Sequence, residues 1–355
     1  MKSGIKYVDG MDLHGVIKAG LEDFELDYTG CKSADMILEN GGNIEGIAIS
    51  LCDFTDKGFL KENASQIFRD AMSVADRYNA YIVIDTANVK KASVLEQIID
   101  ECVNEIVASD VNIFIENGYT NDNEGSRLVE LTDKLNMLAG CDKFGICINV
   151  GHANLLGINV RDMVRVCGKK TGIMHINDND GKGDYHQMPY TFTTGRGLLS
   201  TDWGNIIGDL SRTGFDGRFV FNVEGTFKRT PAKLHKSMAE LLEAMYEEWI
   251  ESCFKTEEYL AADGKKIILF GAGRMALNYM QNWGDKYPPA FLVDNNFEIQ
   301  GQERWGIPVK SPDEILNVPE SERNVWICNM YYDAIGAQLD SMGVEYRCYW
   351  DHYYM

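Results

Sequence analysis

The chain has 355 residues, which is more than one hydrophobic core usually serves and enough for two domains. Hydrophobic residues make up 45% of it and only 7 residues are proline, so the composition is that of a folded chain rather than a disordered one. The formal net charge of −20 argues against nucleic acid as a partner, because nucleic-acid affinity comes from Lys and Arg side chains that neutralise phosphates.

No stretch approaches the roughly 18 uninterrupted apolar residues of a membrane span, and the first residues, MKSGIKYVDGMDL, lack the apolar core of a signal peptide. The nine cysteines contain no CxxC pair, which indicates buried thiols rather than disulfides or a thiolate zinc site. None of them is a catalytic candidate. We therefore expect a cytoplasmic protein without membrane contact.

Short apolar runs recur before residue 230, with helix-like stretches between them. The eight runs are IKYVD (5–9), FELDY (24–28), IEGIAISL (44–51), AYIVIDT (80–86), VNIFIEN (111–117), FGICINV (144–150), TGIMHIN (171–177) and RFVFNVE (218–224). Several are nearly continuous in Val, Ile and Phe, as expected for strands covered on both faces. Strands that alternate with helices indicate parallel βα units, and eight such units close a (β/α)8 TIM barrel.

The stretches between the runs predict amphipathic helices. In 62–78 and 92–109, for example, apolar residues recur three and four positions apart. The barrel is expected over residues 1–230. A linking helix is expected over 231–263, because this segment has strong helix formers and no glycine before residue 259.

A second strand-first pattern follows the linking segment. Its apolar runs are KKIILF (265–270), PAFLVD (289–294), NVWICN (324–329) and EYRCYW (345–350). Residues 264–355 are therefore predicted to form a small Rossmann-like parallel α/β domain.

Polar side chains interrupt the apolar runs where the predicted barrel strands end. They are Glu116, Asn149, His175 and Glu224, with His152 and Asp178 shortly after two of them. The carboxyl ends of the strands are where TIM barrels carry their chemistry. Each residue alone has a simpler interpretation as a solvated carboxylate or a hydrogen-bonded imidazole. Carboxylates and imidazoles that converge on one barrel mouth would be poorly satisfied without a cation, so the group predicts a divalent metal site.

Five ordered blocks resemble those of the xylose isomerase-like barrels. They are FIENG, GICINVGHAN, MHINDNDGKGDYHQMP, GRGLLSTDW and FNVEG. This family includes sugar-phosphate isomerases and epimerases, ketose 3-epimerases, inosose dehydratases and a class of apurinic endonuclease. The resemblance covers residues 1–230. The endonuclease branch has further histidines on earlier strands, where this chain has Asp53 and Asp85, so DNA repair is discounted.

The resemblance implies the roles of the site residues. The implied metal ligands are Glu116, Asn149, His175 and Glu224. His152 stands where the family has a substrate-contacting or second-metal histidine, Asp184 and His186 fall in its D-x-H block, and Gly195 and Gly197 match its glycine pair, so these histidines and Asp184 are expected to bind substrate. Asp178 at the strand end and Lys182 in the glycine-rich loop that follows are further substrate-binding candidates, and Lys182 is expected to meet a phosphate or carboxylate. The simpler alternative for Lys182 is a solvated surface charge.

The chain departs from the family at Asn149, where the family has Asp. Asn keeps a carbonyl oxygen but lacks the negative charge, which predicts weaker metal binding. A mixture of oxygen and nitrogen ligands suits Mn, Zn or Co, and Mg less well.

The resemblance also implies that Glu116 and Glu224 form an acid/base pair, one removing a proton next to a carbonyl and the other returning it. The predicted function is that of a divalent-metal-dependent isomerase or epimerase acting on a sugar, polyol or sugar phosphate. Two alternatives stay open. One is a lyase of the inosose dehydratase kind, and the other is a non-catalytic sugar- or nucleotide-binding protein whose metal site is degenerate through Asn149.

The tail carries a nucleotide-binding pattern. Gly271, Gly273 and Ala276 stand directly after a predicted strand in G-x-G-x-x-A spacing, and Asp294 ends the next strand, where a carboxylate accepts from ribose hydroxyls. The segments FLVDNN and WGIPVKSPDEIL resemble small Rossmann-like domains attached to sugar-modifying transferases and nucleotide-sugar enzymes. A nucleotide or nucleotide-sugar ligand is predicted. The alternative is a packing module that joins chains into a homo-oligomer.

Overall fold

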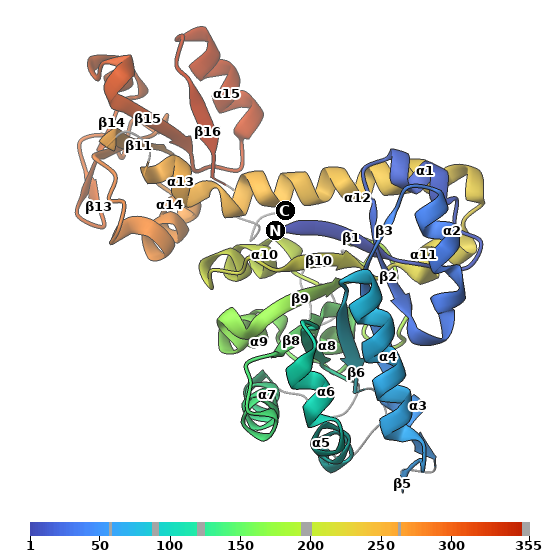
Figure 1. Ribbon diagram of the computed structural model, residues 1–355. Helices are drawn as coiled ribbons and strands as arrows, with labels where there is room; N and C mark the ends of the chain where they lie inside the picture. Colours follow the sequence, from blue (N-terminus) through green and yellow to red (C-terminus); the bar gives the residue numbers. More distant parts are fainter. Residues whose placement is uncertain (57–58, 87–91, 119–124, 193–200, 262–263, 350–355) are drawn as a thin grey trace. The chain divides into compact units, whose positions relative to one another are not determined.

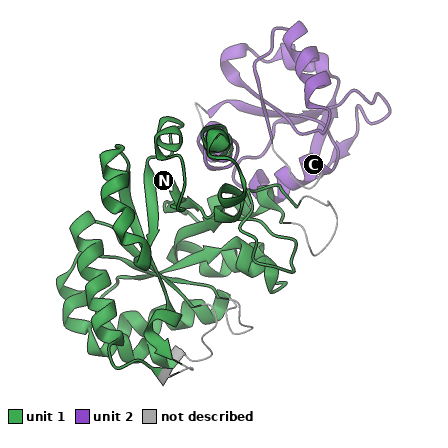
Figure 2. Cartoon of the chain, turned by 90° about the vertical axis from the view of Figure 1, so that its right-hand side faces the viewer, with its two compact units in different colours: residues 1–247 green, residues 248–355 purple. Residues whose placement is uncertain are grey.

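The computed structural model describes residues 1–56, 59–86, 92–118, 125–192, 201–261 and 264–349. The chain divides into two compact units, unit 1 (Met1–Glu247) and unit 2 (Glu248–Met355), which are coloured separately in Figure 2. The division falls inside a helix, α12 (His235–Trp249), within the segment expected to link the two domains.

Unit 1 is a closed barrel of eight parallel strands (Figure 1). They are β1 (Lys2–Lys6), β2 (Asp23–Asp27), β3 (Asn43–Ser50), β6 (Tyr81–Asp85), β7 (Ile113–Glu116), β8 (Phe144–Asn149), β9 (Thr171–Ile176) and β10 (Arg218–Phe221). The strands follow one another around the barrel in chain order, and β10 closes on β1. The predicted (β/α)8 barrel is confirmed. Two strands end three residues earlier than the predicted runs, β1 at Lys6 and β10 at Phe221, whereas the other six end one residue earlier.

Helices connect the strands and surround them. They are α1 (Leu13–Lys18), α2 (Ala34–Glu39), α3 (Leu51–Phe54), α4 (Ala64–Tyr78), α5 (Ala92–Glu101), α6 (Val103–Ala108), α7 (Gly125–Ala139), α8 (Val150–Leu155), α9 (Val160–Cys167), α10 (Trp203–Arg212) and α11 (Glu224–Arg229). A short hairpin, β4 (Thr55–Asp56) and β5 (Phe59–Leu60), follows α3. The predicted helix at 62–78 is α4, whose buried residues are spaced by three and four, whereas the predicted helix at 92–109 is divided at Cys102 into α5 and α6.

Two aromatic rings fill the amino end of the barrel interior. The rings of Tyr81 and Phe114 meet edge to face with centroids 5.7 Å apart. Glycines on β3 and β9 make room for them, since a Cβ atom would lie 2.4 Å from the Tyr81 ring at Gly46 and 2.2 Å from the Phe114 ring at Gly172. The amino end is therefore packed with side chains, and the polar groups of the interior lie toward the carboxyl ends of the strands.

Unit 2 contains a six-stranded sheet in the order β13-β14-β12-β11-β15-β16. The strands are β11 (Lys266–Phe270), β12 (Phe291–Val293), β13 (Glu303–Arg304), β14 (Ile307–Lys310), β15 (Arg323–Ile327) and β16 (Tyr346–Cys348). All pair in parallel except β13, which is antiparallel to β14. Strand order reverses between β11 and β15, as in doubly wound sheets. Alternate residues of β11 enter two separate cores, which covers the sheet on both faces.

The structure adds detail to the predictions for unit 2. The four predicted strands correspond to β11, β12, β15 and β16, whereas the antiparallel pair β13 and β14 was not predicted. Helices α14 (Arg274–Tyr279) and α15 (Tyr332–Ser341) follow β11 and β15. The linking helix is interrupted, because a π-helical turn (Ile250–Phe254) separates α12 from α13 (Thr256–Ala261). Within the described ranges, no helix combines the length and apolar character needed to cross a membrane.

Candidate functional site

The carboxyl ends of β7, β8 and β9 bring three predicted site residues together. Glu116 Oε1 accepts a hydrogen bond from Asn149 Nδ2 at 2.7 Å and lies 2.7 Å from His175 Nδ1. All three side chains are buried. Strand register brings them together, because Asn149 and His175 pair directly across β8 and β9. Their role as metal ligands stays a prediction.

The amide of Asn149 has a defined orientation. Its Oδ1 accepts from the backbone N–H of His152 at 3.1 Å and from Asn177 Nδ2 at 2.8 Å. Because a backbone N–H can only donate, the oxygen of the amide must face the start of α8, and the NH2 group faces Glu116. In this arrangement Asn149 presents hydrogens rather than a carbonyl oxygen to the Glu116–His175 pair.

His175 is held between two carboxylates. Its Nδ1 donates to Glu116, and its Nε2 donates to Glu25 Oε2 at 3.1 Å. The Tyr81 hydroxyl donates to the same oxygen at 3.2 Å, whereas Glu25 Oε1 accepts no hydrogen bond from the described residues. Burial would lower the pKa of His175, but the charges of the carboxylates of Glu25 and Glu116 raise that pKa well above its ordinary value. The resulting imidazolium balances part of the buried negative charge.

Lys6 adds a second positive charge to the barrel interior. It ends β1 and forms an ion pair with Asp27 at 2.9 Å. Burial would lower the pKa of Lys6, but Asp27, Glu25 and Glu116 raise it above its ordinary value. Burial would likewise raise the pKa of Glu116, but the charge and hydrogen bond of His175 hold it well below its usual range. Glu116 is therefore a carboxylate at neutral pH.

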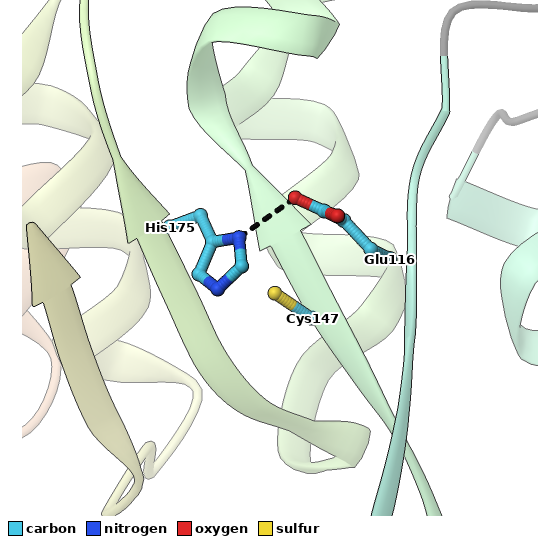
Figure 3. Close-up of side chains that lie close together, drawn as sticks. All are labelled: Glu116, Cys147 and His175. Atoms are coloured by element: carbon cyan, nitrogen blue, oxygen red, sulfur yellow. Dashed lines mark hydrogen bonds and ion pairs between the residues drawn. The ribbon is translucent and has the colours of Figure 1, made fainter. Parts of the chain in front are cut away.

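Cys147 completes a buried group that we call the inner cluster, Glu116, Cys147 and His175. Cys147 pairs directly with Glu116 across β7 and β8. One potential ligand atom from each of the three residues lies within 4.8 Å of the others (Figure 3). Burial raises the pKa of the Cys147 thiol to about 12. The thiol therefore keeps its proton unless a cation binds next to it.

A second group, the outer cluster, consists of His152, Asp184 and His186. Asp184 Oδ2 lies 2.8 Å from His186 Nε2 and 3.7 Å from His152 Nε2. The other ring nitrogen of His152 lies 2.8 Å from the carbonyl oxygen of Asn117, so Nδ1 carries the proton and Nε2 turns its lone pair toward Asp184. Burial lowers the pKa of His152, which keeps this ring neutral.

His186 has an unusual backbone conformation. Its φ of 47° lies in the left-handed region, which costs a residue other than glycine roughly 1–3 kcal/mol and is concentrated at functional sites. Its Nδ1 donates to the carbonyl oxygen of Asn222 at 3.1 Å. Burial would lower the pKa of His186, but the hydrogen bond and charge of Asp184 raise it.

The two predicted acid/base carboxylates lie beside opposite members of the outer cluster. Ligand atoms of Glu116 and His152 lie within 4.8 Å of each other. Glu224, the first residue of α11, accepts a hydrogen bond from Lys228 at 2.9 Å. Burial would raise the pKa of Glu224, but this hydrogen bond and the charge of His186 lower it. Both carboxylates are therefore ionised, and the rings of His152 and His186 meet edge to face with centroids 6.3 Å apart.

The loop after β9 is organised by Asp178. Its backbone pairs with that of Gln187, and its carboxylate accepts from the Phe192 N–H at 3.1 Å and from the Thr201 hydroxyl at 2.9 Å. These bonds hold the segment that carries Asp184 and His186 of the outer cluster. The side chain of Lys182 in the same loop is exposed. The predicted glycine pair, 195 and 197, lies outside the described residues.

In unit 2 the predicted nucleotide-binding residues lie after β11. Gly271 has a φ of 120°, and a Cβ atom there would lie 2.4 Å from the carbonyl oxygen of Cys328, so only glycine fits. Asp294 Oδ2 accepts from the Ala272 N–H at 2.9 Å, which uses this carboxylate to hold the glycine loop. Gly273 is exposed with open space around it, and Ala276 is buried in the core.

The sequence interpretation missed three side chains of the barrel interior, Lys6, Glu25 and Cys147. A signal for Glu25 was present, because a carboxylate between Phe24 and Leu26 in a buried strand needs a partner. Lys6 was placed inside a run expected to end at Asp9, which hid its position at a strand end. Nothing in the sequence separates Cys147 from the other thiols.

The distances in the outer cluster and the hydrogen bonds of the predicted ligands show how well each set fits a divalent metal. In the outer cluster, a separation of 3.7 Å between His152 Nε2 and Asp184 Oδ2 corresponds to a ligand angle of roughly 130° for metal bonds of about 2.0–2.1 Å. The outer cluster fits an ion once the His186 hydrogen bond opens slightly. The predicted four-ligand set would require Asn149 to turn its amide oxygen toward Glu116, and Oε2 of Glu224 accepts from Lys228 in the described arrangement.

A closed parallel barrel with carboxylates and imidazoles at the carboxyl ends of its strands defines a TIM-barrel protein with a polar site at the barrel mouth. Residues 23–249 match the family described as Xylose isomerase-like TIM barrel. The chain belongs to this family, and the resemblance seen in its sequence is confirmed. No curated protein matches the chain.

Solved structures of similar fold include several sugar epimerases. L-ribulose 3-epimerase is 15% identical, with 74% of this chain and 98% of that chain covered and a TM-score of 0.54. D-psicose 3-epimerase from Clostridium cellulolyticum H10 is 13% identical, with 70% and 99% covered and a TM-score of 0.52. 3-keto-D-glucoside 4-epimerase from E. coli is 12% identical, with 69% and 99% covered and a TM-score of 0.50. At these identities the likeness shows a shared fold.

Proposed function

We propose that the chain is a divalent-metal-dependent isomerase or epimerase that moves a proton next to the carbonyl group of a sugar, polyol or sugar phosphate. The observation that carries this proposal is the placement of two ionised carboxylates, Glu116 and Glu224, beside the two histidines of the outer cluster. Membership of the xylose isomerase-like family and the sugar epimerases of similar fold support the reaction class.

In this proposal the two carboxylates are the acid/base pair. One takes a proton from the carbon next to the carbonyl, and the other returns a proton to that carbon. Both are ionised before substrate binds, as the base must be, so the carboxylate that acts as the acid first takes up a proton from solvent. Lys228 holds Glu224 through its hydrogen bond, so it positions this base. Exposed Lys182 is proposed to meet a phosphate or carboxylate of the substrate.

The metal is proposed to bind to His152, Asp184 and His186, because these residues already lie together and include a neutral imidazole and a carboxylate. When bound, it would supply positive charge that polarises the substrate carbonyl. Such a site of two nitrogens and one oxygen suits Mn, Zn or Co.

The test is to incubate candidate sugars with the metal-supplied protein in D2O and to follow new isomers and deuterium at the carbon next to the carbonyl by NMR. Glu116→Gln and Glu224→Gln should each lower the rate by roughly 10²–10⁴-fold. The matched control is Glu105→Gln, a carboxylate on α6 paired with Arg69, which should leave the rate unchanged. Loss of water without deuterium exchange into an isomer would indicate a lyase, and unchanged rates in both variants would contradict the proposal.

We also propose that unit 2 binds a nucleotide or nucleotide-linked sugar at the carboxyl ends of β11 and β15, where the strand order reverses. A cavity of about 200 Å³ lies there. Its lining residues are Gly273, Arg274, Met275, Cys328, Asn329 and Met330. Since ligand sites usually exceed roughly 300 Å³, this cavity would hold only part of the ligand.

Calorimetric titration with ADP and with UDP-glucose tests this second proposal. Binding that is lost in Gly273→Asp, which places a negative charge in open space at the cavity, would support a phosphate site there. Binding that this change leaves intact would place the ligand elsewhere, and absence of binding by either compound would favour a packing module.

A further inference from the structure

The inner cluster combines three kinds of ligand atom inside the barrel. Glu116 offers a carboxylate oxygen, His175 an imidazole nitrogen and Cys147 a sulfur, all within 4.8 Å of one another. Figure 3 shows the three side chains converging from β7, β8 and β9. The direct pairing of Glu116 with Cys147 across β7 and β8 fixes two of these donors on neighbouring strands. The arrangement is therefore built into the strand register rather than into a loop.

Glu25 orients the imidazole of this cluster. Because Glu25 Oε2 accepts from His175 Nε2 at 3.1 Å, the nitrogen that faces Glu116 is Nδ1. A carboxylate that accepts from one ring nitrogen and leaves the other to the cation is the usual support of a metal-bound histidine. Tyr81 holds Glu25 in turn with its hydroxyl. Glu25 is 1% exposed, so this support is shielded from water.

The orientation of the Asn149 amide leaves the sulfur of Cys147 as the available second anionic ligand. The amide turns hydrogens toward Glu116, so the oxygen that an Asp would supply at this position is missing in the observed arrangement. Cys147 lies two residues earlier on the same strand, and its side chain enters the same interior. A protein thiolate can replace the missing carboxylate as the second anionic ligand, which with Glu116 neutralises a divalent ion.

We propose that Glu116, Cys147 and His175 form a metal site for a thiophilic divalent cation, Zn²⁺ in the first place. The inference rests on the proposed metal dependence and deepens it, because it gives the ion a position at the inner cluster in place of the outer cluster. On binding, the thiol proton of Cys147 and the proton between His175 and Glu116 leave to solvent, and the ion forms bonds to sulfur, nitrogen and oxygen. Thiolate and imidazole ligands select Zn²⁺ or Co²⁺ over Mg²⁺ and Mn²⁺. Three protein ligands leave one position of a tetrahedral ion open, as in catalytic zinc sites.

Cobalt titration of the chelator-treated full chain tests the proposal. Co²⁺ should produce a near-ultraviolet thiolate-to-cobalt charge-transfer band with a stoichiometry of one, and Zn²⁺ should abolish it by competition. Cys147→Ser should remove the band and weaken Zn²⁺ binding by more than the roughly 10–100-fold expected for loss of a supporting residue. The matched control is Cys167→Ser, a buried thiol on α9 that should leave the band unchanged.

Each result decides the matter. Co²⁺ that binds with visible bands but without a sulfur band would place the ion at the outer cluster, which overturns the inference and leaves the proposed function intact. A chain that binds no Co²⁺ or Zn²⁺ would overturn both. If Cys147→Ser fails to fold, X-ray absorption of the zinc-loaded wild type decides, because one sulfur neighbour per zinc is expected and a shell of only nitrogen and oxygen contradicts the site.

Discussion

Replacing Asn149 by Asp should turn a satisfied hydrogen-bonded cluster into one that requires a cation. The change keeps the size of the side chain and its oxygen at the start of α8, where Asn149 accepts from the His152 N–H. It replaces the NH2 group, 2.7 Å from Glu116 Oε1, by a second carboxylate oxygen. Two unit charges at this separation repel by about 6 kcal/mol at an effective dielectric constant of about 20.

Proton uptake limits the actual loss of stability. The pair can take up one proton, which at pH 7 costs about 4 kcal/mol for a carboxyl with an ordinary pKa of about 3.9. We therefore expect the free energy of unfolding of the variant to be about 3–4 kcal/mol lower than that of wild type in chelator at pH 7. Its unfolding temperature should be about 10 °C lower. Since repulsion raises the pKa of the pair above its unfolded value, this deficit should shrink by about 1.4 kcal/mol per pH unit as the pH falls from 7 toward 4.

The assay is thermal unfolding followed by circular dichroism, with EDTA or with a divalent metal. Asn149→Ala is the control, because it removes the donor to Glu116 without adding charge. In EDTA the Asp variant should be the less stable of the two, and Zn²⁺ or Mn²⁺ should reverse that order, since the ion takes the place of the shared proton. Equal stability of the Asp variant and wild type in EDTA at pH 7 would refute the orientation of the Asn149 amide described above.

Two further predictions concern stability away from the site. Asp209, which is 2% exposed and pairs with Arg161 at 2.7 Å, has its pKa lowered by the arginines around it although burial opposes this. Asp209→Asn should therefore cost about 2 kcal/mol at pH 7, and this cost should begin to shrink near pH 4 and be lost as the pH falls through the lowered pKa of Asp209, as urea titrations across that range would show. Gly271→Ala should lower the unfolding temperature of unit 2, because the new Cβ meets the carbonyl of Cys328 at 2.4 Å at a φ of 120°, whereas Gly273→Ala should not, since its φ is −99° and the space is open.

Strand positions of the barrel could be predicted from sequence because parallel strands buried on both faces leave continuous apolar runs. The residues that end these runs followed from the same pattern, so Glu116, Asn149 and His175 were located together. The partners of these residues could not be predicted, since hydrogen bonding depends on register. A shift of one position in β8 would exchange the inward-facing Cys147 for its neighbours. The orientation of the Asn149 amide depends likewise on donors from α8 and from the next strand.

Local interactions also determine the partners of Glu224 and Asp294, which the sequence did not reveal. Glu224 was expected at a strand end, but β10 stops at Phe221 and Glu224 begins α11, where Lys228 one turn later pairs with it. Asp294 follows its strand as expected, yet its carboxylate holds the glycine loop through the Ala272 N–H. In both cases the residue type and position were readable, whereas the partner was determined by the neighbouring turn.

The charge of the inner cluster is set jointly by Glu25 and Asn149, which leads to a final prediction. His175 carries one positive charge and faces two carboxylates, Glu25 and Glu116, so a third at position 149 lacks compensation. Glu25→Gln removes one of these charges and Asn149→Asp restores it on the other side of the imidazole. The double variant should therefore be more stable than the sum of the single changes predicts, by about 1–2 kcal/mol in a double-mutant cycle measured in EDTA. Additive losses would mean that Glu25 only fills space, and that the charge of His175 does not link the two positions.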